Sequence, residues 1–165
     1  WAIEAQPGSA YDARIPIEVE AIALDGIEVS VRSRAVARKL EPVFERMERG
    51  LGGIFLTTHD FLQRGNGPVA NMLQGLPSTR VTGNGGSSWR LSFRRGSSNL
   101  QAGCSPEIWV DGIRMVSARG DQSEFLAMST LDVEVIEVFP SASSIPADYA
   151  TNSFCMVGIW TKRGG

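Results

Sequence analysis

Few residues in this chain could do chemistry. The single histidine, His59, lies in the segment TTHDF, and the two cysteines, Cys104 and Cys155, are far from it and from each other. A nucleophilic triad or a transition-metal site would need further partners at suitable spacings, and the sequence has none. Glu134 and Glu137 are three positions apart on an expected strand, so their side chains point to opposite faces and do not form a catalytic pair. We therefore expect a protein that is not an enzyme and that holds no metal or cofactor.

Three further features have simple explanations. The segment GNGGSS at 83–88 is rich in glycine, but it lacks the Lys-Ser or Lys-Thr ending of a phosphate loop and precedes a strand. Asp111 and Gly112 stand between two alternating apolar runs, which is the pattern of a two-residue hairpin turn. His59 stands near the start of an expected helix, as a polar residue often does. None of these features indicates a catalytic or phosphate-binding site.

The two cysteines stand just ahead of expected strands, in CSPEIWVDG and CMVGIWT. Neighbouring strands would bring Cys104 and Cys155 close together. A disulfide between them would close a loop of about 50 residues, worth roughly 4 kcal/mol in the loop-entropy model. It would also imply an oxidising compartment. The alternative is a pair of buried thiols in a cytosolic protein.

Composition and charge narrow the class of protein. The chain has 165 residues, a net charge of −2, and 16 basic against 18 acidic residues. A nucleic-acid-binding surface would need a basic excess. No apolar run approaches the roughly 18 residues of a membrane-spanning helix. The first residue is Trp1 and not methionine, so we expect a processed form, from which a signal peptide has been removed, or a piece of a longer chain.

The first fourteen residues, WAIEAQPGSAYDAR, have no helical or strand periodicity and contain Pro and Gly. We expect an extended N-terminal arm over 1–14, followed by a single domain over 15–165. An aromatic side chain on such an arm has no local core to enter. Two arginines at the end of an expected strand offer a second possible contact surface. The candidate partner contacts are Trp1, Ile3, Tyr11, Arg94 and Arg95.

Helices are expected in the first half of the chain, after two strands in 15–33 that are joined at Asp25-Gly26. Pro42 interrupts the first helical pattern, so we expect that helix to start there and to stop near Gly50. A short helix follows with Thr58 as its N-cap, and another starts at Pro68 and ends at Gly75. The apolar face of the first helix comprises Val36, Leu40, Val43, Phe44 and Met47.

Strands dominate the second half. WRLSFRR alternates strictly between apolar and polar residues, as a half-exposed strand does. EIWVDGIRM is typical of a hairpin that turns at Asp111-Gly112. VEVIEVF and CMVGIWT are apolar at both parities, which indicates strands that are covered on both faces.

Five further segments belong together: FERMERGLGGIFLTTHDFLQRGNGPVANMLQGLPSTRV, WRLSFRRG, PEIWVDGIRM, LDVEVIEVFPSASSIPADYA and CMVGIWTKRGG. In this order they resemble the plug domain of TonB-dependent outer-membrane receptors, over about 44–164. The sequence departs from the family pattern at three places. Ser78 stands where the family usually has glycine, Phe139-Pro140 replaces an Arg-Gly-Pro run, and Ala150 replaces the glycine after the tyrosine.

The resemblance implies an α+β fold: a small mixed sheet from 89 to 162 with helices from 34 to 75 packed on it. It also implies a periplasmic protein, peripheral to a membrane. We expect a non-catalytic structural subunit that braces or binds the protein subunits of a larger membrane-associated complex, for example a photosynthetic or respiratory assembly. This expectation rests on the chain ending where a receptor would continue into its barrel. The alternative is the plug of a TonB-dependent transporter, which gates substrate uptake.

Overall fold

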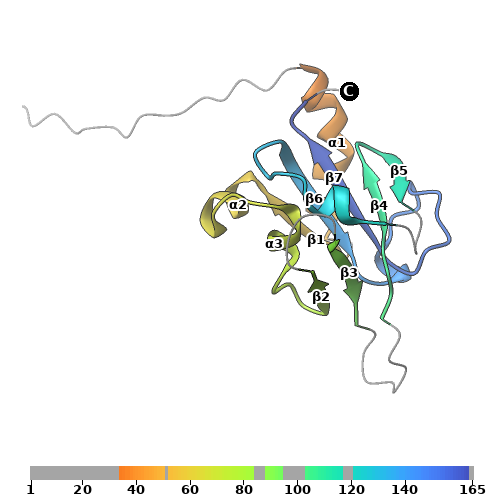
Figure 1. Ribbon diagram of the computed structural model, residues 1–165. Coiled ribbons are helices and arrows are strands. Elements are labelled where there is room, and N and C mark those ends of the chain that lie inside the picture. The colour runs from red at the N-terminus through yellow and green to blue at the C-terminus, as the bar shows by residue number, and fades with distance from the viewer. Residues whose placement is uncertain (1–33, 51, 84–87, 95–102, 117–120, 164–165) are drawn as a thin grey trace, which may run out of the picture. The chain divides into compact units, whose positions relative to one another are not determined.

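The computed structural model describes residues 34–50, 52–83, 88–94, 103–116 and 121–163, all within one compact unit, Arg32–Gly165. The expected arm over 1–14 and the expected strands between 15 and 33 lie outside these residues. The elements, in chain order, are α1 (Arg34–Arg49), β1 (Ile54–Thr57), α2 (Thr58–Arg64), α3 (Val69–Leu73), β2 (Thr79–Thr82), β3 (Arg90–Phe93), β4 (Glu107–Val110), β5 (Ile113–Val116), α4 (Ser123–Leu126), β6 (Val133–Phe139), the 3₁₀ turn η2 (Ala142–Ser144) and β7 (Met156–Thr161) (Figure 1).

The main sheet has five strands in the order β1-β6-β7-β4-β5. β4 and β7 are parallel, and the other neighbours are antiparallel, so the sheet is mixed. β6 is buried along its whole length, and β7 is buried up to Thr161. Both central strands are therefore covered on two faces, as their apolar sequences predict. The α+β fold with a small mixed sheet that the resemblance implies is confirmed.

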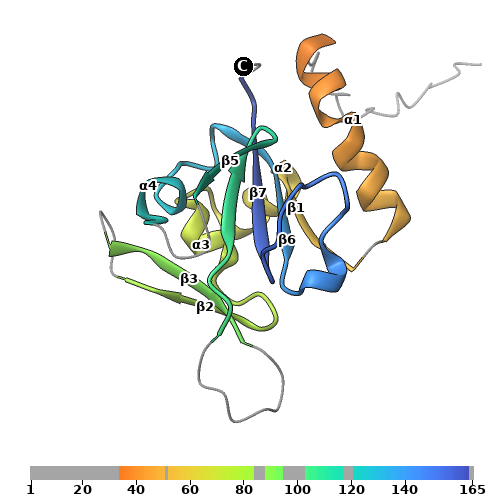
Figure 2. The ribbon, with the colours of Figure 1, turned by 90° about the vertical axis from the view of Figure 1, so that its right-hand side faces the viewer.

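The two faces of the main sheet differ, because alternate residues of a strand point to opposite sides. We call one side the apolar face; it packs against α2, α3 and the β2–β3 ribbon. Its residues include Leu56, Ile108, Ile136, Val138, Val157 and Ile159. We call the other side the ionic face; α1 and the loop after β6 cover it (Figure 2). Its residues include Val135, Glu137, Phe139, Met156 and Trp160.

The structure corrects three expectations. The expected strand WRLSFRR is not part of the main sheet: β3 pairs with β2 in a separate two-stranded sheet, because the preceding β2 is its local antiparallel partner. β1 is a strand that the sequence did not predict, since four residues carry too short a pattern. The next helix begins at Thr58 with Thr57 as its N-cap; Thr57 and Asp60 form a capping box.

The first helix also begins earlier than expected. α1 starts at Arg34 and has Pro42 inside it. Proline lacks an N–H and normally breaks a helix interior. Pro42 lies on the exposed side, so the carbonyl left without a helical partner can be hydrated by solvent. The end of α1 at Arg49, just before Gly50, agrees with the prediction.

Candidate functional site

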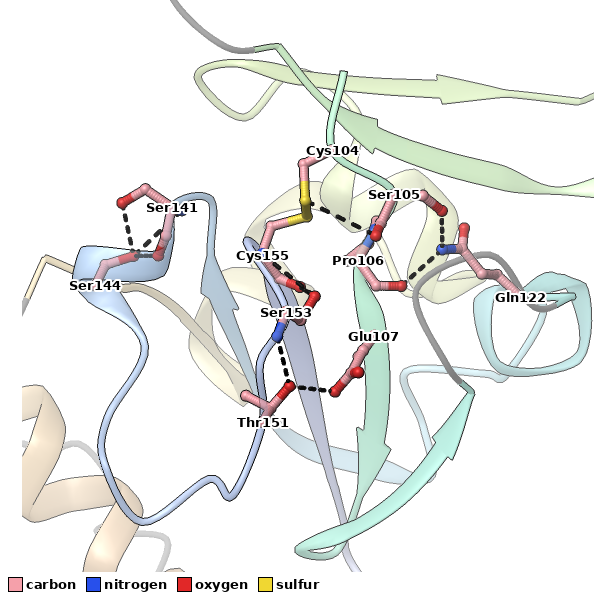
Figure 3. Close-up of a disulfide and its surroundings, with 10 residues drawn as sticks. All are labelled: Cys104, Ser105, Pro106, Glu107, Gln122, Ser141, Ser144, Thr151, Ser153 and Cys155. Atoms are coloured by element: carbon pink, nitrogen blue, oxygen red, sulfur yellow. Dashed lines mark hydrogen bonds between the residues drawn. A yellow bond between two sulfur atoms is a disulfide. The ribbon is translucent and has the colours of Figure 1, made fainter. Parts of the chain in front are cut away.

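The predicted disulfide is present. Cys104 and Cys155, which are 51 positions apart in sequence, are joined with a Cα–Cα distance of 6.2 Å (Figure 3). Cys104 exchanges two backbone hydrogen bonds of 2.8 Å with Phe93, at the end of β3. Cys155 directly precedes β7 and is fully buried. The disulfide therefore links the β2–β3 ribbon to the main sheet on its apolar face.

A buried amide supports the same junction. Gln122 donates to the backbone oxygen of Pro106 at 2.9 Å and to the Ser105 hydroxyl at 3.2 Å (Figure 3). Its side-chain oxygen accepts from the backbone N–H of Leu91 at 2.9 Å. One side chain thus joins β3 to the segment that leads into β4. Both N–H groups and the oxygen of this buried amide are thus engaged in fixing the position of the ribbon.

The turn between β4 and β5 also makes contacts with β7 and α1 through the Asp111 carboxylate. Asp111 and Gly112 have φ values of 50° and 82°, as a two-residue hairpin turn requires. Asp111 Oδ1 accepts from the Thr161 N–H at 2.8 Å, and Asp111 Oδ2 accepts from the Thr161 hydroxyl at 2.7 Å. Lys39 Nζ of α1 donates to Asp111 Oδ1 at 2.8 Å and to the backbone oxygens of Thr161 and Arg163, each at 2.9 Å. The turn carboxylate therefore also anchors α1 to the end of β7.

The second anchor of α1 is a buried ion pair that the sequence analysis missed. Arg46 Nη2 lies 2.9 Å from Glu137 Oε1, and Arg46 Nε lies 3.1 Å from the same oxygen. The Tyr149 hydroxyl donates to Glu137 Oε2, and its ring faces the Arg46 guanidinium at 5.2 Å. The side chains of Glu137 and Arg46 are 0% and 5% exposed. Both charges are thus enclosed between α1 and the sheet.

The electrostatics of this cluster follow from its burial. Loss of solvation raises the pKa of Glu137, while the Tyr149 hydroxyl and the Arg46 guanidinium act in the opposite direction. Burial and the neighbouring carboxylate also raise the pKa of the Tyr149 phenol well above its usual range. Since the Glu137 carboxylate is fully covered, it cannot reach a substrate while α1 is in place. The arrangement positions an element and does not expose a reactive group.

Two further residues shape the space around Glu137. A Cβ on Gly158 would lie 3.2 Å from Glu137 Oε2 and 3.2 Å from the Tyr149 hydroxyl, so a side chain there would crowd the pair. The indole N–H of Trp160 lies beside the same groups and partly opposes the rise in the pKa of Glu137 that burial causes. In the described part of the chain, Trp160 Nε1 is the one buried side-chain polar atom without a hydrogen bond of ordinary geometry. Glu137 lies inside the otherwise apolar run VEVIEVF, and such a buried carboxylate requires a buried partner, so the sequence did indicate that one exists.

A shallow pocket of about 580 Å³ lies within the loop between β6 and β7. Small and apolar side chains line most of it, together with the polar Thr151, Asn152 and Ser153. No charged side chain lines it, so it has no anchor for an ionic ligand. Across the described ranges, no group of three His, Cys, Asp or Glu residues is arranged to hold a metal ion.

The other residues selected from the sequence are not brought together. Arg94 is exposed just after β3, and its backbone N–H donates to the Ser78 oxygen at 2.7 Å. Ser78 has a φ of 62°, a left-handed conformation that glycine adopts more readily than serine. His59 is exposed on α2 beside Gln63, at 2.8 Å. The remaining candidate contacts, Trp1, Ile3, Tyr11 and Arg95, lie outside the described residues.

The edge strand β5 carries exposed apolar side chains. Ile113 and Met115, two positions apart on the edge strand β5, are 67% and 53% exposed. Both residues lie on β5, whose pairing with β4 shifts register between Arg114 and Val116. Among the residues that the structure describes, no helix is both long enough and apolar enough to cross a membrane.

Comparisons with known proteins point to one family. The model of the TonB-dependent Receptor Plug Domain matches residues 55–153, more than half of the chain. A chain in the structure of the FpvAI–pyocin S2 complex is similar with a TM-score of 0.51 at 13% identity, over 67% of this chain and 14% of that chain. The ferric yersiniabactin uptake receptor FyuA from Yersinia pestis gives 0.45 at 15% identity, over 67% and 17%. No curated protein matches in sequence. At these identities the likeness shows the fold alone, and the chain spans a small part of the length of these structures.

Proposed function

Because the chain belongs to the plug-domain family of TonB-dependent receptors, we propose that it is a non-catalytic domain on the periplasmic side of a membrane that works by contacting other protein segments. It is peripheral to the membrane, takes no cofactor and binds no nucleic acid. The family match carries this proposal, and two features of the site support it. The buried charges anchor an element and are closed to substrates, and the disulfide suits an oxidising compartment such as the periplasm.

The form of this role that the family match favours is the plug of a TonB-dependent outer-membrane receptor, which gates substrate uptake. The match runs from β1 to the loop before β7, and so takes in most of the main sheet. An antibody against this domain tests the proposal on membranes of the source cells. We expect the antigen in the outer-membrane fraction, on the same polypeptide as a receptor or in a stable complex with one. Recovery with other membrane proteins and no receptor would contradict the receptor role.

A second role is favoured by the exposed apolar pair Ile113 and Met115 on β5. Exposed apolar edge strands are typical contact sites for other chains. In this role the domain braces a larger membrane-associated complex, such as a photosynthetic or respiratory assembly. Met115→Asp should then remove the domain from the complex recovered in mild detergent. Leu62→Asp is the matched control, since Leu62 on α2 is also exposed, at 65%. Equal recovery of both variants would contradict this role.

A further inference from the structure

Helix α1 is attached to the rest of the domain through a short glycine-rich connection. The family match begins at residue 55, after α1 has ended at Arg49. The connection to β1 contains Gly50, Gly52 and Gly53, and the first two have positive φ values of 62° and 77°. α1 therefore precedes the matched residues and is joined to them by a connection that glycine makes conformationally permissive.

The side of α1 that faces the sheet has a simple chemical pattern. Lys39 and Arg46 are seven positions apart, about two helical turns, so they lie on the same side of the helix. Leu40 and Val43 lie between them and are fully buried. The pattern is a cation at i, apolar residues at i+1 and i+4, and a second cation at i+7.

The sheet carries the complementary pattern, and its anions are held by groups that do not belong to α1. Asp111 is fixed by the backbone N–H and the hydroxyl of Thr161. Glu137 is fixed by the hydroxyl of Tyr149. Val135 and Trp160 lie in the same cluster as the apolar residues of α1. Each anion thus keeps at least one hydrogen-bond donor if α1 leaves.

We propose that this part of the ionic face is a helix-binding groove, which α1 occupies within the chain and which an amphipathic helix of a partner protein occupies in its place. The partner helix carries two cations seven positions apart and apolar residues at the first and fourth positions after the first cation. Charge complementarity selects this occupant, because a helix without both cations would leave Glu137 or Asp111 poorly compensated. α1 then acts as a built-in competitor that keeps the groove closed until a better-matched helix arrives.

Competition within one chain sets the design of the experiment. A tethered helix has a high effective concentration, so a free peptide cannot displace it easily from the unmodified protein. The test therefore uses the full chain with Lys39→Gln and Leu40→Ala, which weaken the attachment of α1 and leave the groove unchanged. The probe is a fluorescent peptide with the sequence of residues 34–50, RAVARKLEPVFERMERG. Its binding is followed by fluorescence anisotropy.

The double variant should bind this peptide at least tenfold more tightly than the unmodified protein does. A peptide with glutamine in place of the two cations that correspond to Lys39 and Arg46 should not bind. The matched protein control carries Glu45→Gln and Arg49→Gln, an exposed pair on α1 at 3.2 Å, and should bind no better than the unmodified protein. Equal binding of both peptides, or no binding by the double variant, would overturn the proposal.

Two readouts keep the test decisive. If the double variant is unfolded by circular dichroism, the single variant Lys39→Gln replaces it, excess peptide is added, and amide hydrogen exchange is measured in the protein's own α1. Faster exchange there supports displacement, and unchanged exchange overturns it. The mass of the double variant without peptide is also measured by light scattering. A dimer that the peptide dissociates would assign the groove to a second copy of this chain and overturn the partner-helix proposal. The groove is a property of the domain, so its failure would leave the receptor role standing.

Discussion

The two faces of the main sheet are covered by different kinds of interaction. On the apolar face, Ile136 and Ile159 pack in one continuous cluster with the side chains of α2 and α3. On the ionic face, a smaller cluster is flanked by two charge pairs, Lys39–Asp111 and Arg46–Glu137. The same two strands, β6 and β7, supply both faces through alternate residues.

The two kinds of interaction differ in how strongly they hold the elements that cover each face of the sheet. Burial of apolar area is not directional, so the apolar face gains free energy from many small contacts. A buried ion pair gains little net free energy, because the lost solvation of both charges offsets their attraction. It does, however, penalise any arrangement in which one charge is buried alone. The ion pairs of the ionic face therefore add little to the free energy of unfolding. They do determine which helix can cover this face, because a helix without matching cations would leave a buried anion unpaired.

The largest effect should come from breaking the buried pair on one side. We expect Arg46→Met to lower the free energy of unfolding by about 3–5 kcal/mol at pH 8, because Glu137 is left buried without its cation. Urea unfolding measures this value. The control is Arg46→Met together with Glu137→Leu, which removes both charges and should recover most of the loss. A double variant as unstable as the single one would show that packing, and not charge, holds α1.

The disulfide on the apolar side should come next. Cys104→Ala with Cys155→Ala should cost roughly 4 kcal/mol in the loop-entropy model, since the bond closes a separation of 51 residues. Chemical reduction of the unmodified protein should give the same unfolding midpoint. A loss below about 1 kcal/mol would mean that Gln122 and the ribbon contacts hold this side without the covalent bond.

The pH dependence should distinguish the faces. Burial raises the folded-state pKa of Glu137 above its ordinary value of 4.5, so the folded protein binds more protons than the unfolded chain does between these two values. The contribution of Glu137 to stability is thus present below pH 4.5 and is lost as the pH rises through the raised pKa. The expected loss is about 1.4 kcal/mol for each unit of the rise.

Glu137→Gln removes this dependence. We therefore expect the unfolding free energy of the unmodified protein, minus that of the variant, to fall as the pH rises through this range. Urea titrations at several pH values measure the difference. A difference that stays constant or increases with pH would contradict the raised pKa.

The smallest effect belongs to the apolar face. Ile136→Val removes one methylene from a fully buried side chain and should cost about 1 kcal/mol. The cost should not change between pH 5 and pH 8, because no titrating group depends on this contact. A pH-dependent cost would show that the two faces are coupled through β6.

The sequence predicted those features that depend on local patterns. The Asp111-Gly112 turn, the two-sided burial of β6 and β7 and the plug family were all visible in short segments. Arg46 and Glu137 are 91 positions apart, so their pairing needed the fold. Glu137 could still have been suspected, because a charge inside a strand covered on both faces needs a partner. The start of α1 at Arg34 could not be predicted, because proline normally breaks a helix interior and the sequence does not show that Pro42 lies on the exposed side. β3 lies outside the main sheet because it pairs with β2. The alternation of apolar and polar residues in β3 predicts a strand but does not specify the partner of that strand.

Native-state hydrogen exchange compares the two covers most directly. The central claim is that α1 is a separable cover held by two charge pairs, whereas α3 is part of the cooperative core. The account predicts that the amides of α1 between Leu40 and Arg49 exchange through an opening that costs less than global unfolding and depends less strongly on urea, because it exposes less surface. The amides of β6 and the protected amides after α3, such as that of Gln74, should exchange only through global unfolding. If α1 and β6 exchange with the same free energy and the same urea dependence, α1 is an integral part of the core and the account is wrong.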